Sequence, residues 1–129
     1  MKLLLDTQCW LWMQASPSRF DGETLRLLRE PGHEVLLSAA SSWEIGIKYA
    51  LGKLPLPLPP DEYVPTRMHR SGTRGLPILH SHALRAASLP FHHRDPFDRL
   101  LVAQAQIDKL TLVTADRQLE AYEVDLRMI

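Results

Sequence analysis

Short apolar runs alternate with helix-like segments along this 129-residue chain, and this alternation most restricts how the chain can fold. The run Lys2–Leu5 ends at Asp6, and the run Leu110–Thr114 is followed two residues later by Asp116. Each run is typical of a buried strand. Strands that alternate with helices favour a parallel sheet covered on both faces. The expected fold class is therefore α/β, a three-layer sandwich in which helices flank a central parallel sheet.

Apolar spacing, together with helix start and stop residues, predicts the bounds of the individual elements. The expected strands are residues 2–5, 34–37, 76–79, 110–114 and 124–129. The expected helices are residues 7–13, 21–30, 38–51, 61–70, 81–89, 95–109 and 115–122. The clearest helix is 95–109, because Asp95 suits the N-cap and Pro96 the first helical position. Pro65 argues against a long regular helix over 61–70, and the proline-rich residues 53–60 are expected to be extended.

Length and composition favour one domain over residues 1–129, since 45% hydrophobic residues suffice for a core. No apolar run approaches the roughly 20 residues that a bilayer span requires. Asp6 interrupts the opening apolar residues before they reach the length of a signal peptide core. A single cysteine, Cys9, cannot form an internal disulfide and suits a reducing compartment. We therefore expect a soluble cytoplasmic protein with no membrane association.

The formal net charge of zero conceals an uneven distribution of charge along the chain. The segment between Glu62 and Asp95 contains no acidic residue but is rich in arginine and histidine. Its basic residues are Arg67, His69, Arg70, Arg74, His80, His82, Arg85, His92, His93 and Arg94. A cationic surface of this kind would suit a polyanion such as nucleic acid, with the histidines exposed or facing RNA. A solvated surface whose acids lie elsewhere in the sequence explains the charge pattern equally well.

Asp6 and Asp116 both follow expected strands, so they should lie at the same edge of a parallel sheet. Ligands of open α/β sheets bind at this edge. Aspartate is also a favoured N-cap of a helix that follows a strand, and capping alone would explain either residue.

Asp98 and Glu44 lie on expected helices beside apolar neighbours. The residues three and four positions after Asp98 are Leu101 and Val102, so Asp98 begins the face that should turn toward the sheet. A capping-box role at the third helical position is the alternative for Asp98. Glu44 is four residues before Lys48, which allows a routine surface pair worth about 0.3–0.5 kcal/mol.

Four carboxylates gathered in one cleft would repel each other unless a positive charge compensated them. Oxygen ligands of this kind suit Mg²⁺ or Mn²⁺, which can activate water and bind a scissile phosphate. No glycine-rich turn follows a strand, which argues against a nucleotide-binding enzyme. The acids and the basic segment together indicate a phosphodiester substrate.

Four sequence blocks resemble PIN-domain ribonucleases of the VapC type, the toxins of bacterial toxin–antitoxin pairs. The resemblance covers nearly the whole chain, and its blocks are Leu3-Leu4-Leu5-Asp6-Thr7, Ser38–Ile45 with Lys48 and Gly52-Lys53-Leu54, His93–Leu101 running into Ala103-Gln104-Ala105, and Leu112–Asp116. Gln8 occupies a position where many relatives with this first block carry histidine. That departure affects a candidate substrate contact and leaves the carboxylates intact.

The resemblance implies a PIN-like sandwich and a metal-dependent endoribonuclease that hydrolyses RNA with Mg²⁺ or Mn²⁺. Matched by position, the catalytic and metal-binding residues fall on Asp6, Glu44, Asp98 and Asp116, with Thr114 in a supporting role beside the last acid. Lys48, Arg94 and Arg99 are candidate RNA contacts.

The expected partners are RNA, a cognate antitoxin protein and a second copy of the chain. The helices that carry Trp10, Trp12 and Trp43 are candidates for the dimer surface, although core packing would also explain these tryptophans. The alternatives for the function are a non-catalytic PIN-like interaction module and an RNA-processing nuclease without a toxin role.

Overall fold

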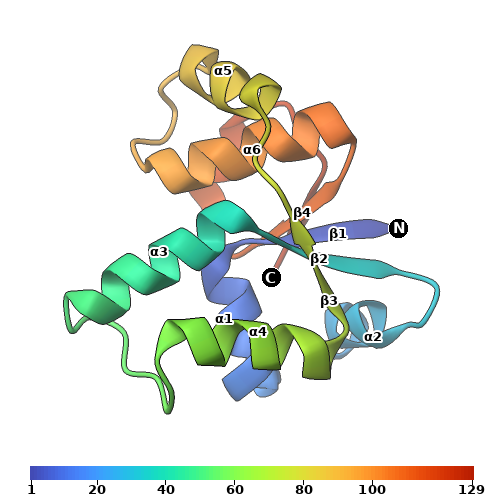
Figure 1. The fold of residues 1–129 in the computed structure, drawn as a ribbon. Coiled ribbons are helices and arrows are strands. Elements are labelled where there is room, and N and C mark those ends of the chain that lie inside the picture. The colour runs from blue at the N-terminus through green and yellow to red at the C-terminus, as the bar shows by residue number, and fades with distance from the viewer.

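The computed structural model describes residues 1–129, and its five strands form one parallel sheet in the order β3-β2-β1-β4-β5 (Figure 1). The strands are β1 (Lys2–Leu5), β2 (Glu34–Ser38), β3 (Thr73–Leu76), β4 (Thr111–Thr114) and β5 (Leu126–Met128). The helices are α1 (Thr7–Ala15), α2 (Gly22–Arg29), α3 (Ala39–Ala50), α4 (Pro60–Ser71), α5 (His80–Ser88) and α6 (Pro96–Asp108), with 3₁₀ turns η1 (Pro17–Arg19) and η2 (Arg117–Ala121). This arrangement confirms the expected α/β class and its three layers.

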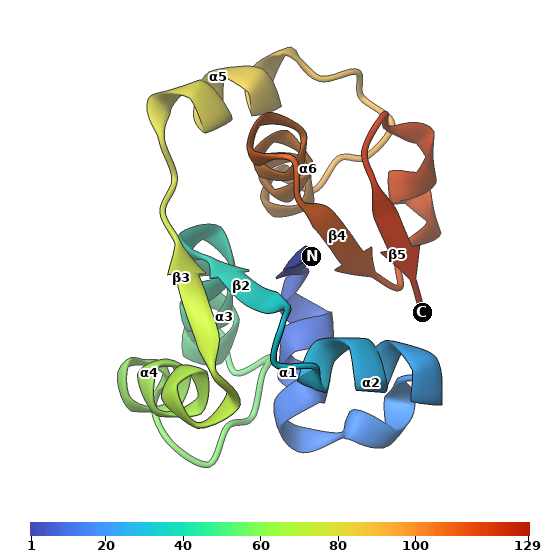
Figure 2. The same cartoon turned by 90° about the vertical axis from the view of Figure 1, so that its right-hand side faces the viewer.

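Two apolar cores lie on opposite faces of the sheet, and α5 and α6 lie on the face away from α1, α2 and α4 (Figure 2). Successive residues of β1 supply both cores, since side chains alternate between the faces of a strand. Leu3 and Leu5 face the core that contains Trp10, whereas Leu4 faces the core that contains Leu101. Burial on both faces explains why β1 is apolar without alternation.

The third strand lies three residues earlier in the sequence than predicted, at Thr73–Leu76 and not at residues 76–79. Pro77 ends the strand, because proline has no backbone N–H to donate to the sheet. The apolar residues that suggested a strand are partly exposed in the connection to α5, with Ile78 37% and Leu79 54% accessible. β3 is an edge strand, and there Arg74 pairs with Glu34 of β2 at 2.7 Å.

The predicted starts of α3 and α6 are confirmed. Ser38 caps α3 by accepting a hydrogen bond from the Ala40 backbone N–H at 3.0 Å. Asp95 caps α6 by accepting one from Phe97, and Pro96 occupies the first turn. Both caps satisfy backbone donors that a helix leaves unpaired at its first turn.

Two other helices differ from expectation. α4 continues through Pro65, although proline has no backbone N–H to donate to the carbonyl four residues earlier. That carbonyl belongs to Asp61, which is exposed to solvent. The short helix expected over residues 115–122 is confined to the 3₁₀ turn η2 at Arg117–Ala121. None of the helices combines the length and the apolar character needed to cross a membrane.

Candidate active site

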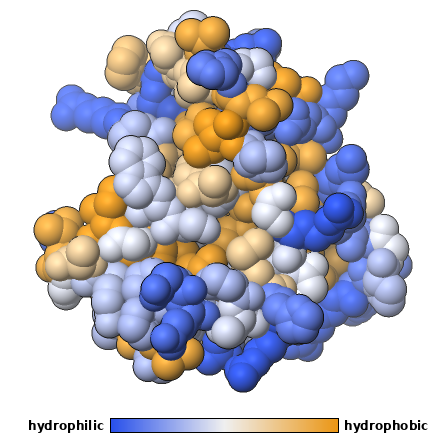
Figure 3. All heavy atoms as spheres, in the orientation of Figure 1, coloured by the Kyte–Doolittle hydropathy of each residue, from blue (hydrophilic) through white to orange (hydrophobic).

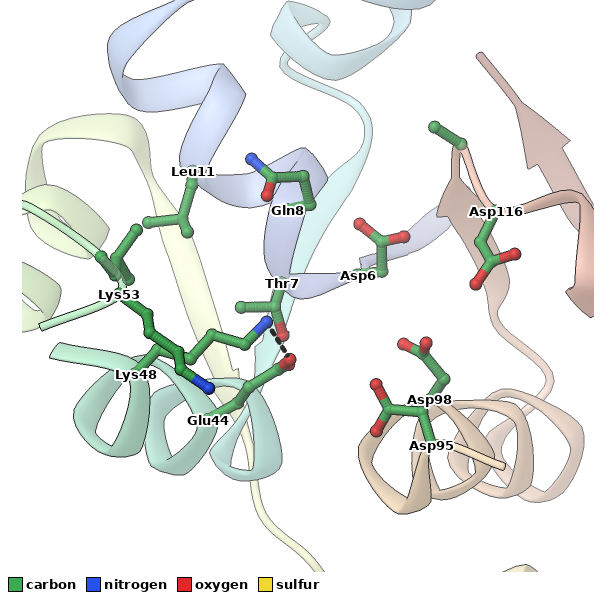
Figure 4. A pocket seen from close by; sticks show the side chains of 12 residues that line it. Asp6, Thr7, Gln8, Leu11, Glu44, Lys48, Lys53, Asp95, Asp98 and Asp116 are labelled. Carbon is green, nitrogen blue, oxygen red and sulfur yellow. Dashed lines mark ion pairs between the residues drawn. The ribbon is translucent and has the colours of Figure 1, made fainter. Parts of the chain in front are cut away.

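A cleft of about 490 Å³ lies at the carboxyl edge of the sheet, where β1 and β4 end and where α1, α3 and α6 pass nearby (Figure 4). Its lining includes five carboxylates and two lysines. The lining residues are Asp6, Thr7, Gln8, Leu11, Glu44, Lys48, Lys53, Leu54, Asp95, Asp98, Ala115 and Asp116. The structure therefore brings together all four acids of the predicted quartet, although they come from four separate parts of the sequence.

Asp6 links the end of β1 to the start of α1 and is only 7% exposed. Its Oδ1 accepts a hydrogen bond from the Cys9 backbone N–H at 2.7 Å, and its Oδ2 accepts one from the Thr114 hydroxyl. Burial raises the pKa of Asp6, against the opposite effect of these hydrogen bonds. Burial also raises the pKa of the Cys9 thiol, and the nearby Asp6 carboxylate adds to that shift. The helix cap that the sequence allowed for Asp6 thus exists within the cleft.

Thr114 connects the two acids at the strand ends. Its hydroxyl donates to Asp6 and accepts a hydrogen bond from the Asp116 backbone N–H at 3.0 Å. β1 and β4 are hydrogen-bonded neighbours in the sheet, and the Asp6 backbone N–H donates to the Val113 carbonyl at 3.0 Å. Strand pairing and the Thr114 hydroxyl therefore hold Asp6 and Asp116 next to each other.

Asp98 has the most perturbed carboxyl group in the cleft. Burial, followed by the negative charges of Asp95 and Asp6, raises the pKa of Asp98 to about 7, and His93 opposes this shift. The capping box that the sequence allowed does not form, because the Asp95 backbone N–H donates to His93 Nδ1 at 3.0 Å. Asp98 instead faces the other acids, as its apolar neighbours on α6 suggested (Figure 4).

Glu44 and Lys48 form an ion pair of 2.8 Å inside the cleft. The Glu44 side chain is 8% exposed and the Lys48 side chain 50% exposed, so this pair is more buried than a routine surface contact. The hydrogen bond to Glu44 raises the pKa of Lys48. Lys53 extends toward the same part of the cleft from the turn after α3 (Figure 4). This turn depends on Gly52, whose φ of 72° is unfavourable for other residues.

His93 lies at the site although it was not among the predicted site residues. Its Nε2 lies 2.6 Å from Asp116 Oδ2 and 3.2 Å from Asp98 Oδ2, and its side chain is 11% exposed. The expectation of an exposed histidine is therefore wrong for His93. It is also wrong for His82, which is 1% exposed and lies beside Asp108. The signals in the sequence were its place at the start of the block His93–Leu101 and its position two residues before the Asp95 cap.

The two arginines predicted to contact RNA lie outside the cleft lining. Arg94 is exposed. Arg99 is 6% exposed, and its guanidinium donates to the backbone carbonyls of Ala86, Leu89 and Pro90 at 2.8–3.0 Å. These hydrogen bonds satisfy backbone carbonyls at and just after the C-terminal end of α5, and they favour a structural role for Arg99. Lys48 is the one predicted basic contact that lines the cleft. Lys53, which was not predicted as a contact, lines it as well.

The donor set of the cleft fits a hard divalent cation. Carboxylate oxygens are the ligands that Mg²⁺ and Mn²⁺ prefer. Burial, followed by the neighbouring negative charges, raises the pKa of Asp98, and a bound cation would favour its charged form. Asp98, Asp116 and His93 each bring one polar atom to within 4.8 Å of the others, so the two carboxylates lie close enough to share one ion.

Among protein-family models, that of the PIN domain matches residues 3–125 of the chain. The chain belongs to the PIN domain family. All four acids of the quartet, as well as Thr114, lie inside the matched range. Membership confirms the resemblance seen in the sequence blocks.

One curated relative of this PIN domain is Ribonuclease VapC16 from Mycobacterium tuberculosis. The two sequences are 52% identical over 67 residues, which cover 51% of this chain and 48% of that protein. The match thus spans about half the length of the relative.

Solved structures of VapBC and of FitAcB share the fold. VapBC2 from Rickettsia felis, bound to a promoter DNA fragment, gives a TM-score of 0.73 at 15% identity, covering 99% of this chain and 98% of the other. DNA-bound VapBC from Salmonella typhimurium gives 0.68 at 16% identity with the same coverage. FitAcB from Neisseria gonorrhoeae gives 0.60 at 20% identity, with 96% and 95% coverage. At these identities the likeness concerns the fold alone.

Proposed function

We propose that this PIN domain is a divalent-metal-dependent endoribonuclease and the toxin component of a toxin–antitoxin pair. The observation that carries the proposal is the convergence of Asp6, Glu44, Asp98 and Asp116 in one cleft beside two lysines. The similarity to a protein named as a ribonuclease supports RNA as the substrate.

The four acids would hold Mg²⁺ or Mn²⁺ as catalytic and metal-binding residues. When bound, such an ion lowers the pKa of water and offsets negative charge on the phosphate. Thr114 keeps the Asp6 carboxylate turned into the cleft by donating its hydroxyl hydrogen. Asp95 caps α6 and adds a fifth negative charge to the lining.

The two lysines would attract and orient the RNA backbone. Lys48 is half exposed while paired with Glu44, and Lys53 is exposed at the rim. Ammonium groups in such positions bind phosphate oxygens and offset the charge of a nearby acidic cluster. An acidic cleft without them would repel a polyanion.

A protein partner would cover part of the exposed apolar surface. Hydrophobic residues gather over α3 and near α5 on the face drawn in Figure 3. The exposed apolar side chains include Trp43 of α3 at 65% and Leu84 of α5 at 71%. Apolar patches of this kind often mark interfaces, and the VapBC complexes among the structural relatives favour an antitoxin as one occupant. A second copy of the chain is the other proposed partner.

The test of the nuclease proposal is incubation of the purified protein with total RNA, with Mg²⁺, with Mn²⁺ and with EDTA, followed by mapping of new 5′ ends. We expect discrete cleavage that requires the metal. Asp6→Asn should reduce cleavage by at least about 100-fold, since it removes a ligand charge while an oxygen remains for the Cys9 cap. Cleavage that persists in EDTA or in Asp6→Asn would contradict the proposal, and metal binding without cleavage would favour an interaction module.

A further inference from the structure

His93 joins two carboxylates that come from different elements. Its Nε2 lies within hydrogen-bond distance of Asp116, which follows β4, and of Asp98, which is in the first turn of α6. The other ring nitrogen, Nδ1, lies 3.0 Å from the Asp95 backbone nitrogen. Both nitrogens of the ring are therefore engaged inside the site.

The contact with Asp95 decides which nitrogen of His93 carries hydrogen. The Asp95 backbone N–H can only donate, so Nδ1 must accept and its lone pair is occupied. A neutral ring must then carry its hydrogen on Nε2. In this arrangement Nε2 donates its hydrogen to Asp116 Oδ2 at 2.6 Å, with Asp98 Oδ2 at 3.2 Å, and has no lone pair for a metal ion.

A polar network holds His93 in this place. The Tyr122 hydroxyl accepts a hydrogen bond from the His93 backbone N–H at 3.1 Å and donates to the Pro90 carbonyl at 2.7 Å. Arg99 donates to the same hydroxyl at 3.3 Å and to the Pro90 carbonyl at 2.9 Å. The segment of residues 90–93 before α6 is thus held by hydrogen bonds at both Pro90 and His93. These bonds limit the positions that the His93 ring can adopt.

We propose that His93 is a positioning residue that orients the Asp98 and Asp116 carboxylates for a divalent cation and does not ligate the cation itself. This inference rests on the proposed metal site. Two carboxylates that converge on one point repel each other, and a fixed donor between them reduces this repulsion and restricts their rotation. Hydrogen-bonded groups that orient metal ligands in this way typically change metal affinity by 10–100-fold when removed.

The test is calorimetric titration of the metal-free protein with Mn²⁺. We expect His93→Asn to weaken Mn²⁺ binding by about 10–100-fold, because its amide reaches only the position of Nδ1. His93→Gln should restore most of the affinity, because its amide nitrogen can reach the position of Nε2 and donate to both carboxylates. His92→Asn is the matched control, since the His92 ring is exposed and packs edge-on against Tyr122 at 5.0 Å; it should bind Mn²⁺ like the wild type.

A second measurement uses the unaltered protein and so does not depend on the variants folding. Electron paramagnetic resonance of bound Mn²⁺ should show no nitrogen coupling of a directly ligated imidazole. Such coupling in the wild type, lost in His93→Asn, would overturn the inference, as would wild-type affinity in a folded His93→Asn. Absence of Mn²⁺ binding to the wild type would overturn the proposed metal site as well, whereas normal binding and cleavage in His93→Asn would overturn the role of His93 alone.

Discussion

At the scale of single residues, the acids of the cleft are not equivalent. Asp6 and Asp116 accept hydrogen bonds from backbone N–H groups, as helix caps do. Asp98 accepts none from the backbone, and repulsion from Asp95 and Asp6 adds to the effect of burial on its pKa. The charge on Asp98 is therefore the one that the metal-free fold tolerates least.

Asp98 makes the stability of the metal-free protein depend on pH. Its pKa is about 7 in the fold against an ordinary value of 3.8, so between these values the folded state retains a proton that the unfolded state releases. The free energy of unfolding should therefore fall as pH rises from about 4 to about 7. Asp98→Asn should flatten this dependence and raise stability near pH 7.

Urea denaturation at several pH values in EDTA measures this effect. Asp125→Asn is the control, because Asp125 is exposed and lies outside the acidic cleft. An unchanged slope in Asp98→Asn would show that the carboxyl group is solvated.

Lys53 is expected to act on RNA binding and not on the stability of the fold. Lys53→Gln should raise KM several-fold with little change in kcat, and should reduce the slope of log affinity against log salt by about 1. Cleavage of a short RNA at several salt concentrations measures both values. Lys109→Gln removes an equally exposed charge after α6, away from the cleft, and should leave both unchanged.

At the scale of elements, the segment between α5 and α6 depends on one buried arginine. Arg99→Ala would leave the carbonyls of Ala86, Leu89 and Pro90 without this donor and open a gap beside the Phe91 ring. We expect a loss of about 3 kcal/mol in the free energy of unfolding, measured with urea. Arg94→Ala, at an exposed position, should leave stability nearly unchanged. A stable Arg99→Ala variant that no longer binds RNA would instead support the substrate contact expected from the sequence.

The elements differ in how well the sequence predicts them. Helix α6 is predictable because Asp95, Pro96 and its apolar spacing are local signals. Strand β3 is not, because the apolar residues after Pro77 resemble a strand more than Thr73–Leu76 does, and its position depends on pairing with β2.

The same distinction applies to the residues of the site. The strand-end acids follow from the fold class, since parallel strands present their carboxyl ends at one edge. The positions of His93 and Arg99 follow from tertiary contacts with Tyr122, which is distant in sequence from both. Local patterns carry no signal for contacts of this kind.

At the scale of the whole molecule, the proposed metal site should couple to folding. The four acids come together only in the folded chain, so a cation that binds them stabilises the fold by linkage. Free Mn²⁺ at 100 times its Kd should add about 2.7 kcal/mol to the free energy of unfolding and raise Tm. Thermal melts with and without Mn²⁺ measure this, and Asp98→Asn should show a smaller increase. An equal increase in Asp98→Asn would place the ion elsewhere.

Cys9 has a practical consequence for studies of α1. The thiol is fully buried, and burial beside Asp6 raises its pKa, so it is both shielded and held in its unreactive protonated form. As the sole cysteine of the chain, it should react with alkylating reagents only when α1 detaches from the sheet. Its rate of alkylation, followed by mass spectrometry, therefore reports how often this part of the protein opens.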